Sequence, residues 1–147
     1  MKIMKNKLAL IVLASTFVSG CSTTFVEQIM EKDYQSFYLR GVFTWWEADE
    51  NYRIEKVNGN LYKATVKLIA DGQPYDFKFA DENYTPGYDC GSPTGTAGKV
   101  LTVGKTAKSS CENPGGNFQF TPNETGAYDF FIDFTHDQSP VVYIEKA

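Results

Sequence analysis

Short apolar runs and polar turns alternate along the chain from residue 37 onward, which is the pattern of a β-rich domain. Residues 52–57 and 61–68 flank Asn58-Gly59-Asn60, and Asn-Gly between two such runs is the strongest short-range signal of a hairpin. The expected strands, seven to eight in number, are residues 37–43, 52–57, 61–68, 75–80, 100–103, 118–120, 127–134 and 141–144. Since no long amphipathic helix is indicated, the pattern predicts an all-β fold, an immunoglobulin-like antiparallel β-sandwich.

The first residues of the chain have the layout of an export signal. Lys2, Lys5 and Lys7 precede an apolar run at residues 8–18, which is too short for a stable membrane-spanning helix. The run ends in Val18-Ser19-Gly20-Cys21, which resembles the lipobox of bacterial lipoproteins. The alternative is an ordinary secretory signal, in which the cysteine has no special role.

The lipobox resemblance implies a lipoprotein signal peptide at residues 1–20 and a mature N-terminus at Cys21 that carries acyl chains such as palmitate. Several chains, at about 0.8 kcal/mol per buried methylene, form a lasting membrane anchor. Residues 21–36 are then a lipidated tether and residues 37–147 the folded domain. We expect the protein in a bacterial cell envelope. The outer membrane is favoured because Ser22, rather than Asp, follows the cysteine, the sorting preference of enteric-type bacteria.

Composition and charge exclude several classes of function. Without residues 1–20 the chain has 11 Lys and Arg against 18 Asp and Glu, a formal charge of −7, so nucleic acid and anionic lipid headgroups are not expected partners. One histidine and no G-x-S-x-G motif leave only carboxylates for catalysis. The acidic residues of interest lie in turn-like segments, where solvated acids are usual and calcium ligation is the alternative: Glu47, Asp49, Glu50, Asp81 and Glu82. We expect no enzyme activity, no cofactor and no metal.

Two further cysteines, Cys90 and Cys111, are expected to form a disulfide. An even pair in an oxidising compartment is normally bonded, and this bond would order a loop rich in Gly, Ser, Thr and Lys. Closing a loop of this length stabilises a fold by about 3 kcal/mol in the loop-entropy model. A metal site is the alternative, but it would need more Cys or His ligands than His136 alone adds.

The aromatic residues are numerous, and a few of them are not explained by strands. Trp45 and Trp46 are adjacent, so on an extended chain they point to opposite faces and at most one is fully inside. Tyr84 lies in an expected surface turn before Pro86-Gly87. An exposed ring beside hydrogen-bonding groups suits a sugar, whose apolar face stacks on it. A tryptophan that caps the core or lies under a loop fits the composition equally well.

Four segments, in this order, resemble the motifs of family 48 carbohydrate-binding modules. These are the glycogen- and starch-binding early-set sandwiches of branching enzymes, pullulanases and kinase subunits. Residues 41–46, GVFTWW, and residues 75–84, YDFKFADENY, look like G-x-F-x-x-W and Y-x-F-K-x-x-D…W. Residues 115–120, GGNFQF, and residues 126–133, GAYDFFID, are similar to the family's G-G-N-L and G-x-Y-x-F-x-x-D. The resemblance covers about residues 37–145.

By position, the resemblance implies a sugar site that contains Trp46, Lys78, Tyr84 and Asn117, with Trp45 beside it. Two departures from the family pattern matter. Tyr84 stands where the family more often has tryptophan, which gives a smaller platform, and the loop between the two cysteines is longer than the usual connection. These modules also normally accompany a catalytic barrel, which this chain lacks.

The sequence therefore predicts an envelope lipoprotein whose β-sandwich binds α-glucans such as maltodextrin, glycogen or starch without catalysis. A lipid anchor would hold this ligand near uptake machinery or secreted amylases. The alternative is a sandwich that binds no glycan and docks on an envelope protein or a secreted amylase-type partner, with the aromatic residues as hot spots.

Overall fold

The computed structural model describes residues 32–93 and 98–147. Within them Asp33–Ala147 form one compact unit, which begins four residues before the boundary expected at residue 37. Among the described residues no helix is long and apolar enough to cross a membrane. The expected signal peptide, Cys21 and the tether up to residue 31 lie outside the described residues, so the lipid anchor stays a prediction.

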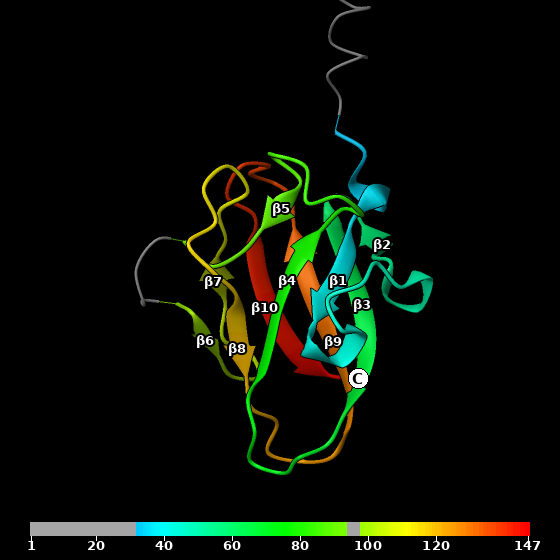
Figure 1. The fold of residues 1–147 in the computed structure, drawn as a ribbon, viewed down its shortest axis with the longest axis vertical. Coiled ribbons are helices and arrows are strands. Elements are labelled where there is room, and N and C mark those ends of the chain that lie inside the picture. Colours follow the sequence, from blue (N-terminus) through cyan, green and yellow to red (C-terminus); the bar gives the residue numbers. More distant parts are fainter. Residues whose placement is uncertain (1–31, 94–97) are drawn as a thin grey trace, which may run out of the picture. The chain divides into compact units, whose positions relative to one another are not determined.

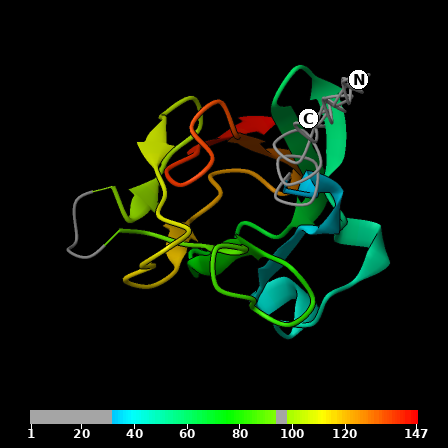
Figure 2. The ribbon, with the colours of Figure 1, turned by 90° about the horizontal axis from the view of Figure 1, so that it is seen from above.

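The described chain has ten strands, arranged in two sheets that lie face to face (Figures 1 and 2). The first, here called the β4 sheet, has the order β1-β4-β8-β6 with β5 also paired to β4: β1 (Tyr38–Gly41), β4 (Tyr75–Ala80), β5 (Asp89–Cys90), β6 (Val100–Leu101) and β8 (Phe118–Phe120). The second, the β9 sheet, has the order β2-β3-β9-β10-β7: β2 (Glu55–Asn58), β3 (Leu61–Leu68), β7 (Ala107–Lys108), β9 (Gly126–Asp133) and β10 (Val141–Lys146). The pairs are antiparallel except for β6 with β8, which is parallel.

The space between the sheets is filled largely by aromatic side chains. On β4 the inward residues Phe77 and Phe79 are buried, while Asp76 and Lys78 alternate with them on the outer face. Phe130 of β9 meets the Phe77 ring edge-on, with the two centroids 4.8 Å apart. Burial of these rings supplies the hydrophobic free energy that holds the two sheets together.

The predicted fold class is confirmed, although several element boundaries differ from the expected ones. β3, β4 and β8 have the predicted bounds. The end of the first expected strand instead forms the 3₁₀ turn η2 (Val42–Thr44), because Thr44 hydrogen-bonds back to Gly41. Another 3₁₀ turn, η3 (Glu50–Tyr52), is capped by Asp49, so β2 begins later than predicted, and a third, η1 (Tyr34–Ser36), precedes β1. The two-residue strands β5 and β7 lack an alternating apolar pattern long enough to predict them.

The predicted disulfide between Cys90 and Cys111 is confirmed, and both residues are buried in the core. Cys90 lies on β5 opposite Phe79 of β4. Cys111 follows β7, and its amide donates to the carbonyl of Gln138, shortly before β10, at 3.1 Å. Since β4 and β10 belong to different sheets, the disulfide ties the two layers together.

Candidate functional site

Two cations lie side by side on the outer face of the β4 sheet. Arg40 of β1 is the register partner of Lys78 of β4. Because Leu39 and Phe79 point into the core, Arg40 and Lys78 point outward. The Lys78 ammonium forms an ion pair with Asp89 of β5, with Nζ 2.6 Å from Oδ1. The segments that follow β1 and β4 both return over this pair of cations.

The loop after β1, residues 41–47, is closed by hydrogen bonds that its own sequence supplies. The Thr44 hydroxyl donates to the Gly41 carbonyl at 3.0 Å and accepts from the Gly41 amide at 3.1 Å. The Trp46 amide donates to the same carbonyl at 3.0 Å. Only glycine fits at residue 41, because a Cβ would come within 2.5 Å of the carbonyl oxygen of Asp76. The chain therefore turns sharply and leaves Trp45 87% exposed.

The turn after β4, residues 81–88, is organised by Asp81. Its Oδ1 accepts from the amides of Asn83 at 3.2 Å and Thr85 at 2.8 Å. Its own amide donates to the carbonyl of Tyr88 at 2.9 Å. Aspartate favours turns because its short side chain can satisfy nearby backbone amides in this way. The turn places Tyr84, which is 38% exposed, over the outer face of the sheet.

The loop and the turn are joined at the carbonyl oxygen of Trp46. This oxygen accepts from the Tyr84 hydroxyl at 2.9 Å, from Arg40 Nε at 2.8 Å and also from Arg40 Nη2. The Arg40 guanidinium carbon lies 3.9 Å from the centroid of the Tyr84 ring, and Lys78 Nζ lies 5.6 Å from it. We call Trp45, Trp46 and Tyr84, the aromatic residues of these two joined segments, the aromatic patch.

Every residue of the aromatic patch has a left-handed backbone. The φ angle is 54° at Trp45, 64° at Trp46 and 53° at Tyr84, and in the described part of the chain these are the non-glycine residues with positive φ. Bulky residues rarely adopt this conformation, which costs about 1–2 kcal/mol for each residue. This form of backbone strain is therefore concentrated at the patch.

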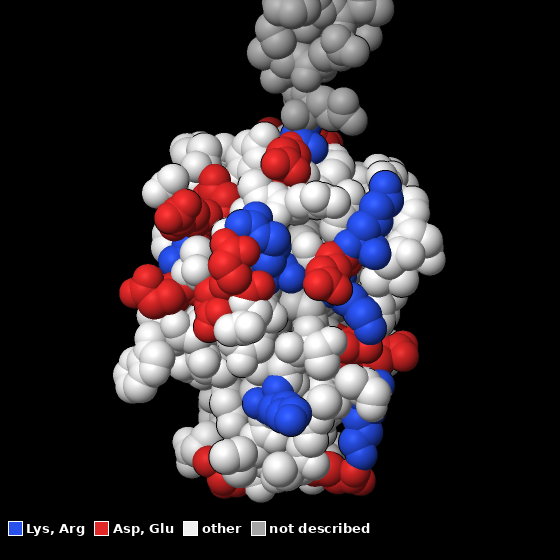
Figure 3. All heavy atoms as spheres, turned by 90° about the vertical axis from the view of Figure 1, so that its right-hand side faces the viewer, with Lys and Arg blue, Asp and Glu red and all other residues white. Residues whose placement is uncertain are grey.

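The patch presents little net charge in spite of the cations beneath it. Asp89 balances Lys78, and Arg40 is only 4% exposed. Burial raises the pKa of the Tyr84 phenol by more than the nearby Arg40 charge lowers it, so the hydroxyl keeps its proton and donates to Trp46. On the side of the molecule seen in Figure 3, acidic and basic side chains lie next to one another.

A second arginine–tyrosine stack fixes η3 to the same strand, β1. The Arg53 guanidinium lies 4.5 Å from the Tyr38 ring centroid, and its Nη2 forms an ion pair with Glu50 at 2.7 Å. The Tyr38 hydroxyl also donates to the Glu50 carboxylate, at 2.7 Å. Hydrogen bonds from Arg53 and then from Tyr38 lower the pKa of the Glu50 carboxyl from 4.5 to about 2.

Over the outer face of the β4 sheet, the structure brings together the backbone of Trp46, to which Trp45 is adjacent, and the side chains of Tyr84 and Lys78. Three of these four expected site residues form the aromatic patch, and Lys78 lies close beneath the Tyr84 ring. Asn117 directly precedes β8, where Phe118 pairs with Phe77 of β4. Continued by one residue beyond the paired strands, this antiparallel register puts Asn117 next to Lys78.

Three features of this surface are not predicted by the sequence. The expectation that Trp45 and Trp46 lie on an extended chain is wrong, because both belong to a tight turn. Arg40 is not among the expected site residues, and Asp81, which the sequence predicts to be a solvated acid, instead shapes a turn. The available signal for Arg40 was its place in an apolar run, where alternation with Leu39 directs it outward.

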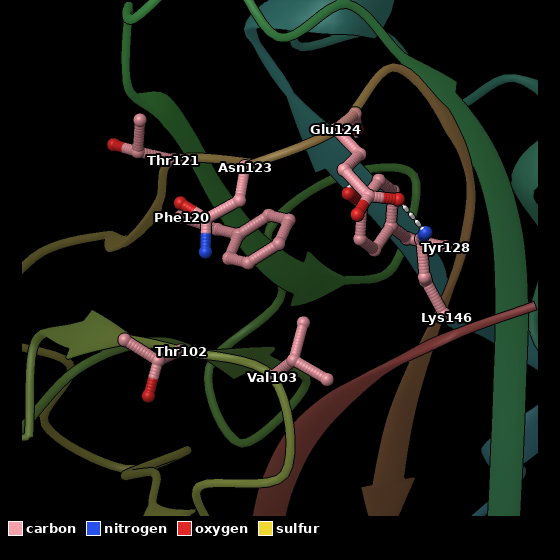
Figure 4. A pocket seen from close by; sticks show the side chains of 8 residues that line it. All are labelled: Thr102, Val103, Phe120, Thr121, Asn123, Glu124, Tyr128 and Lys146. Carbon is pink, nitrogen blue, oxygen red and sulfur yellow. Dashed lines mark hydrogen bonds and ion pairs between the residues drawn. The ribbon is translucent and has the colours of Figure 1, made fainter.

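A separate cavity of about 250 Å³ contains none of the expected site residues (Figure 4). Its lining is Thr102, Val103, Phe120, Thr121, Asn123, Glu124, Tyr128 and Lys146. The Phe120 and Tyr128 rings are each 2% exposed and offer almost no face for stacking, while Glu124 and Lys146 pair with each other. Residues 32–93 and 98–147 also contain no group of three or more His, Cys, Asp or Glu side chains that could hold a metal ion.

Comparison with known proteins identifies the fold. No protein-family model matches the chain, and no curated protein has a sequence that matches it. Among solved structures the chain is similar to the ligand-induced structure of AmyP-SBD, an amylase starch-binding domain. The two share 21% sequence identity with a TM-score of 0.54, and the match covers 99% of this chain and 97% of that chain. The chain therefore has the same β-sandwich fold as that domain.

Proposed function

We propose that this domain binds α-glucans of the maltodextrin, glycogen or starch type through the aromatic patch, without catalysis. The protein is held in a bacterial envelope, in the outer membrane, by lipid on Cys21. The anchor rests on the lipobox resemblance alone. The binding site rests on the geometry of the outer face of the β4 sheet.

The observation that carries the binding proposal is the strained backbone of the aromatic patch. Strain of this kind persists only where the surrounding structure imposes it, and it clusters at functional sites. Here it falls on the two tryptophans of the chain and on a tyrosine, and the most exposed of them, Trp45, has 87% of its surface in contact with solvent. A fold that only needed a turn at these places would be more stable with glycine or asparagine.

The chemistry of the surface suits a neutral sugar. The C–H face of a glucose unit stacks on an aromatic ring, and its hydroxyl groups both donate and accept hydrogen bonds. The Lys78 ammonium uses one donor on Asp89 and has further N–H donors near the Tyr84 ring, and Asn117 supplies an amide with both functions. Asp89 already neutralises Lys78, so the surface does not require an anionic ligand.

The similarity to AmyP-SBD supports this class of ligand, because that structure is of a starch-binding domain. The patch is open and can contact only a few sugar units at once. We therefore expect a dissociation constant in the micromolar to millimolar range, or about 4–8 kcal/mol of binding free energy. Little of the affinity should depend on salt, since charge contributes little.

The proposal is tested by calorimetric titration of the purified full-length protein with soluble glycogen and maltoheptaose. The detergent must have a sugar-free headgroup, because a maltoside would compete for the site. Trp46→Ala should weaken binding more than Lys78→Ala, because it removes a stacking ring rather than one polar group. Tyr143→Ala, which deletes a half-buried ring from the outer face of the β9 sheet, is the matched control and should bind normally.

Wild-type protein that shows no binding to either glucan would refute the glycan proposal. Specific co-purification of an envelope or secreted protein, lost in Trp45→Ala, would then favour the docking alternative. The anchor is tested separately by mass spectrometry of the mature protein. We expect an N-terminal Cys21 that carries acyl chains, whereas an unmodified terminus or cleavage at another residue would refute lipidation.

A further inference from the structure

Arg40 is almost fully buried, yet its hydrogen bonds go to backbone carbonyls rather than to a carboxylate. Nε donates to the Trp46 carbonyl at 2.8 Å, and Nη2 donates to the same oxygen. Nη1 donates to the carbonyls of Asp81 at 2.7 Å and Glu82 at 3.0 Å. No ion pair of the described residues includes Arg40. An arginine without an ionic partner is rarely buried to this extent.

These hydrogen bonds connect the two segments that carry the aromatic patch. The loop after β1 holds Trp46, and the turn after β4 holds Tyr84, 38 residues further along the chain. Both segments are fully described, and no backbone hydrogen bond runs between them. The direct links are the guanidinium of Arg40 and the hydroxyl of Tyr84, which converge on the Trp46 carbonyl.

The guanidinium also determines which face of Tyr84 is free. Arg40 and Lys78 are register partners on the outer face of the sheet, and both lie within 6 Å of the centroid of the ring, at 3.9 and 5.6 Å. Because both side chains rise from the same surface, they cover the inner face of the ring. The opposite face of Tyr84 is left to solvent.

Lysine cannot reproduce this arrangement. A guanidinium is planar and presents its donors in a fixed fork, so it can stack on a ring and bond to carbonyls on two sides at once. An ammonium is a compact point charge on a flexible stem and has no planar face to stack.

We propose that Arg40 is the positioning residue that aligns Trp46 and Tyr84 as one platform for the glucan. It does not touch the ligand, because its own surface is 4% exposed. This inference rests on the proposed function for its ligand, but the alignment of the two aromatic residues is measurable without any sugar.

The test uses Arg40→Lys in the full-length protein, with Arg53→Lys as the matched control. Arg53 also stacks on a tyrosine and donates to a backbone carbonyl, that of Gln35 at 2.8 Å, but it serves η3 rather than the patch. The two tryptophans of the chain both belong to the patch, so fluorescence in a Trp45→Phe background reports on Trp46 alone.

Arg40→Lys should make Trp46 more accessible to acrylamide and weaken glycogen binding about tenfold or more, because misaligned rings lose stacking contacts. Arg53→Lys should change neither measurement. Unchanged quenching together with affinity within twofold of wild type would overturn the proposal. If wild-type protein binds no glucan, the proposed function fails, and the quenching comparison still tests the role of Arg40.

Should Arg40→Lys fail to fold, the wild-type protein provides the decisive measurement. Its three bonded carbonyls should hold the guanidinium rigid, so NMR at 25 °C should show separate Nη signals for Arg40 and slow exchange of its Nε proton with water. A single averaged Nη signal with fast exchange would overturn the proposal.

Discussion

At the scale of single residues, the aromatic patch exposes its rings at a cost in the stability of the folded domain. Trp45 has a φ of 54° and is 87% exposed, so it has a strained backbone and few contacts that could compensate for the strain. A glycine at the same φ avoids the clash between Cβ and the carbonyl oxygen. A substitution at Trp45 can therefore change glucan binding, by removing the ring, and stability, by relieving the backbone strain, and the two effects can be measured separately.

Trp45→Gly should therefore raise the stability of the domain while weakening glucan binding. Relief of the left-handed strain, less the extra entropy of glycine in the unfolded chain, leaves a gain of about 0.5–1 kcal/mol. Urea denaturation measures the gain. Trp45→Ala is the control, because it removes the same ring but keeps the Cβ. An alanine variant as stable as the glycine variant would show that the backbone at residue 45 is not strained.

The Glu50 carboxylate gives the domain a predictable response to acid. Its pKa is about 2 in the folded protein against an ordinary 4.5, because Arg53 and Tyr38 donate to the ionised form. Since the folded pKa is the lower one, this contribution to stability is complete above the ordinary value and is lost as the pH falls toward 2.

Glu50→Gln should flatten the loss of stability between about pH 5 and pH 2, measured by urea denaturation at a series of pH values. Arg53→Gln removes the main hydrogen-bond donor to Glu50 and should likewise reduce the loss of stability over this pH range. Glu55→Gln, at an exposed position of β2, controls for the loss of one negative charge. An unaltered slope in both variants would contradict the assignment of this acid sensitivity to Glu50.

The sequence predicts four residues of the candidate site but not Arg40, the residue that connects the two segments of the patch. Trp46, Tyr84, Lys78 and Asn117 follow from a resemblance in motif order, and the structure brings the first three of them together. Arg40 could not be assigned a role in this way. Its importance depends on which carbonyls meet above β1, and two of the three belong to a turn some 40 residues away in sequence.

At the scale of elements, alternation of apolar and polar residues predicts the long strands well, but local side-chain hydrogen bonds can end a strand earlier than the alternation predicts. The alternation in β3 and β4 is long enough to fix both bounds, and Asn58-Gly59 marks the hairpin before β3. Val42 and Phe43 have strong strand propensity but form a 3₁₀ turn, because the Thr44 hydroxyl bonds to Gly41. The strands β5 and β7 arise from tertiary pairing alone.

The disulfide supports one of these short strands and, through it, the site. Cys90 lies on β5 directly after Asp89, the partner of Lys78. The bond closes a loop between residues 21 positions apart, and both cysteines are buried. Loss of the bond should therefore affect global stability and the neighbourhood of Tyr84 together.

Replacing Cys90 and Cys111 with alanine should lower the free energy of unfolding by about 3 kcal/mol, measured by urea denaturation. Alanine is preferred to serine because a buried hydroxyl would need a hydrogen-bond partner. Asp89→Asn, which keeps the disulfide and weakens only the ion pair, separates the local effect from the global one. A double variant with wild-type stability would show that the loop is already ordered without the bond.

At the scale of the whole molecule, the proposed open site and the proposed lipid anchor would complement each other. A shallow patch on a sandwich binds few sugar units and therefore releases them quickly. Many copies held on one membrane can bind one polymer at several places, and linked binding events raise the apparent affinity by factors of about 100 or more without any new contact. Weak sites then suffice, provided that the ligand is long and the protein is anchored.

The lipidated protein in phosphatidylcholine vesicles should therefore bind glycogen about 100-fold or more tightly than the same protein dispersed in sugar-free detergent. Maltoheptaose is too short to bridge copies and should bind equally in both preparations. Trp46→Ala in vesicles controls for adsorption of glycogen to lipid and should abolish the gain. Equal affinity for glycogen in vesicles and in detergent would show that membrane anchoring does not act through multivalent binding. In that case the anchor would only set the location of the domain.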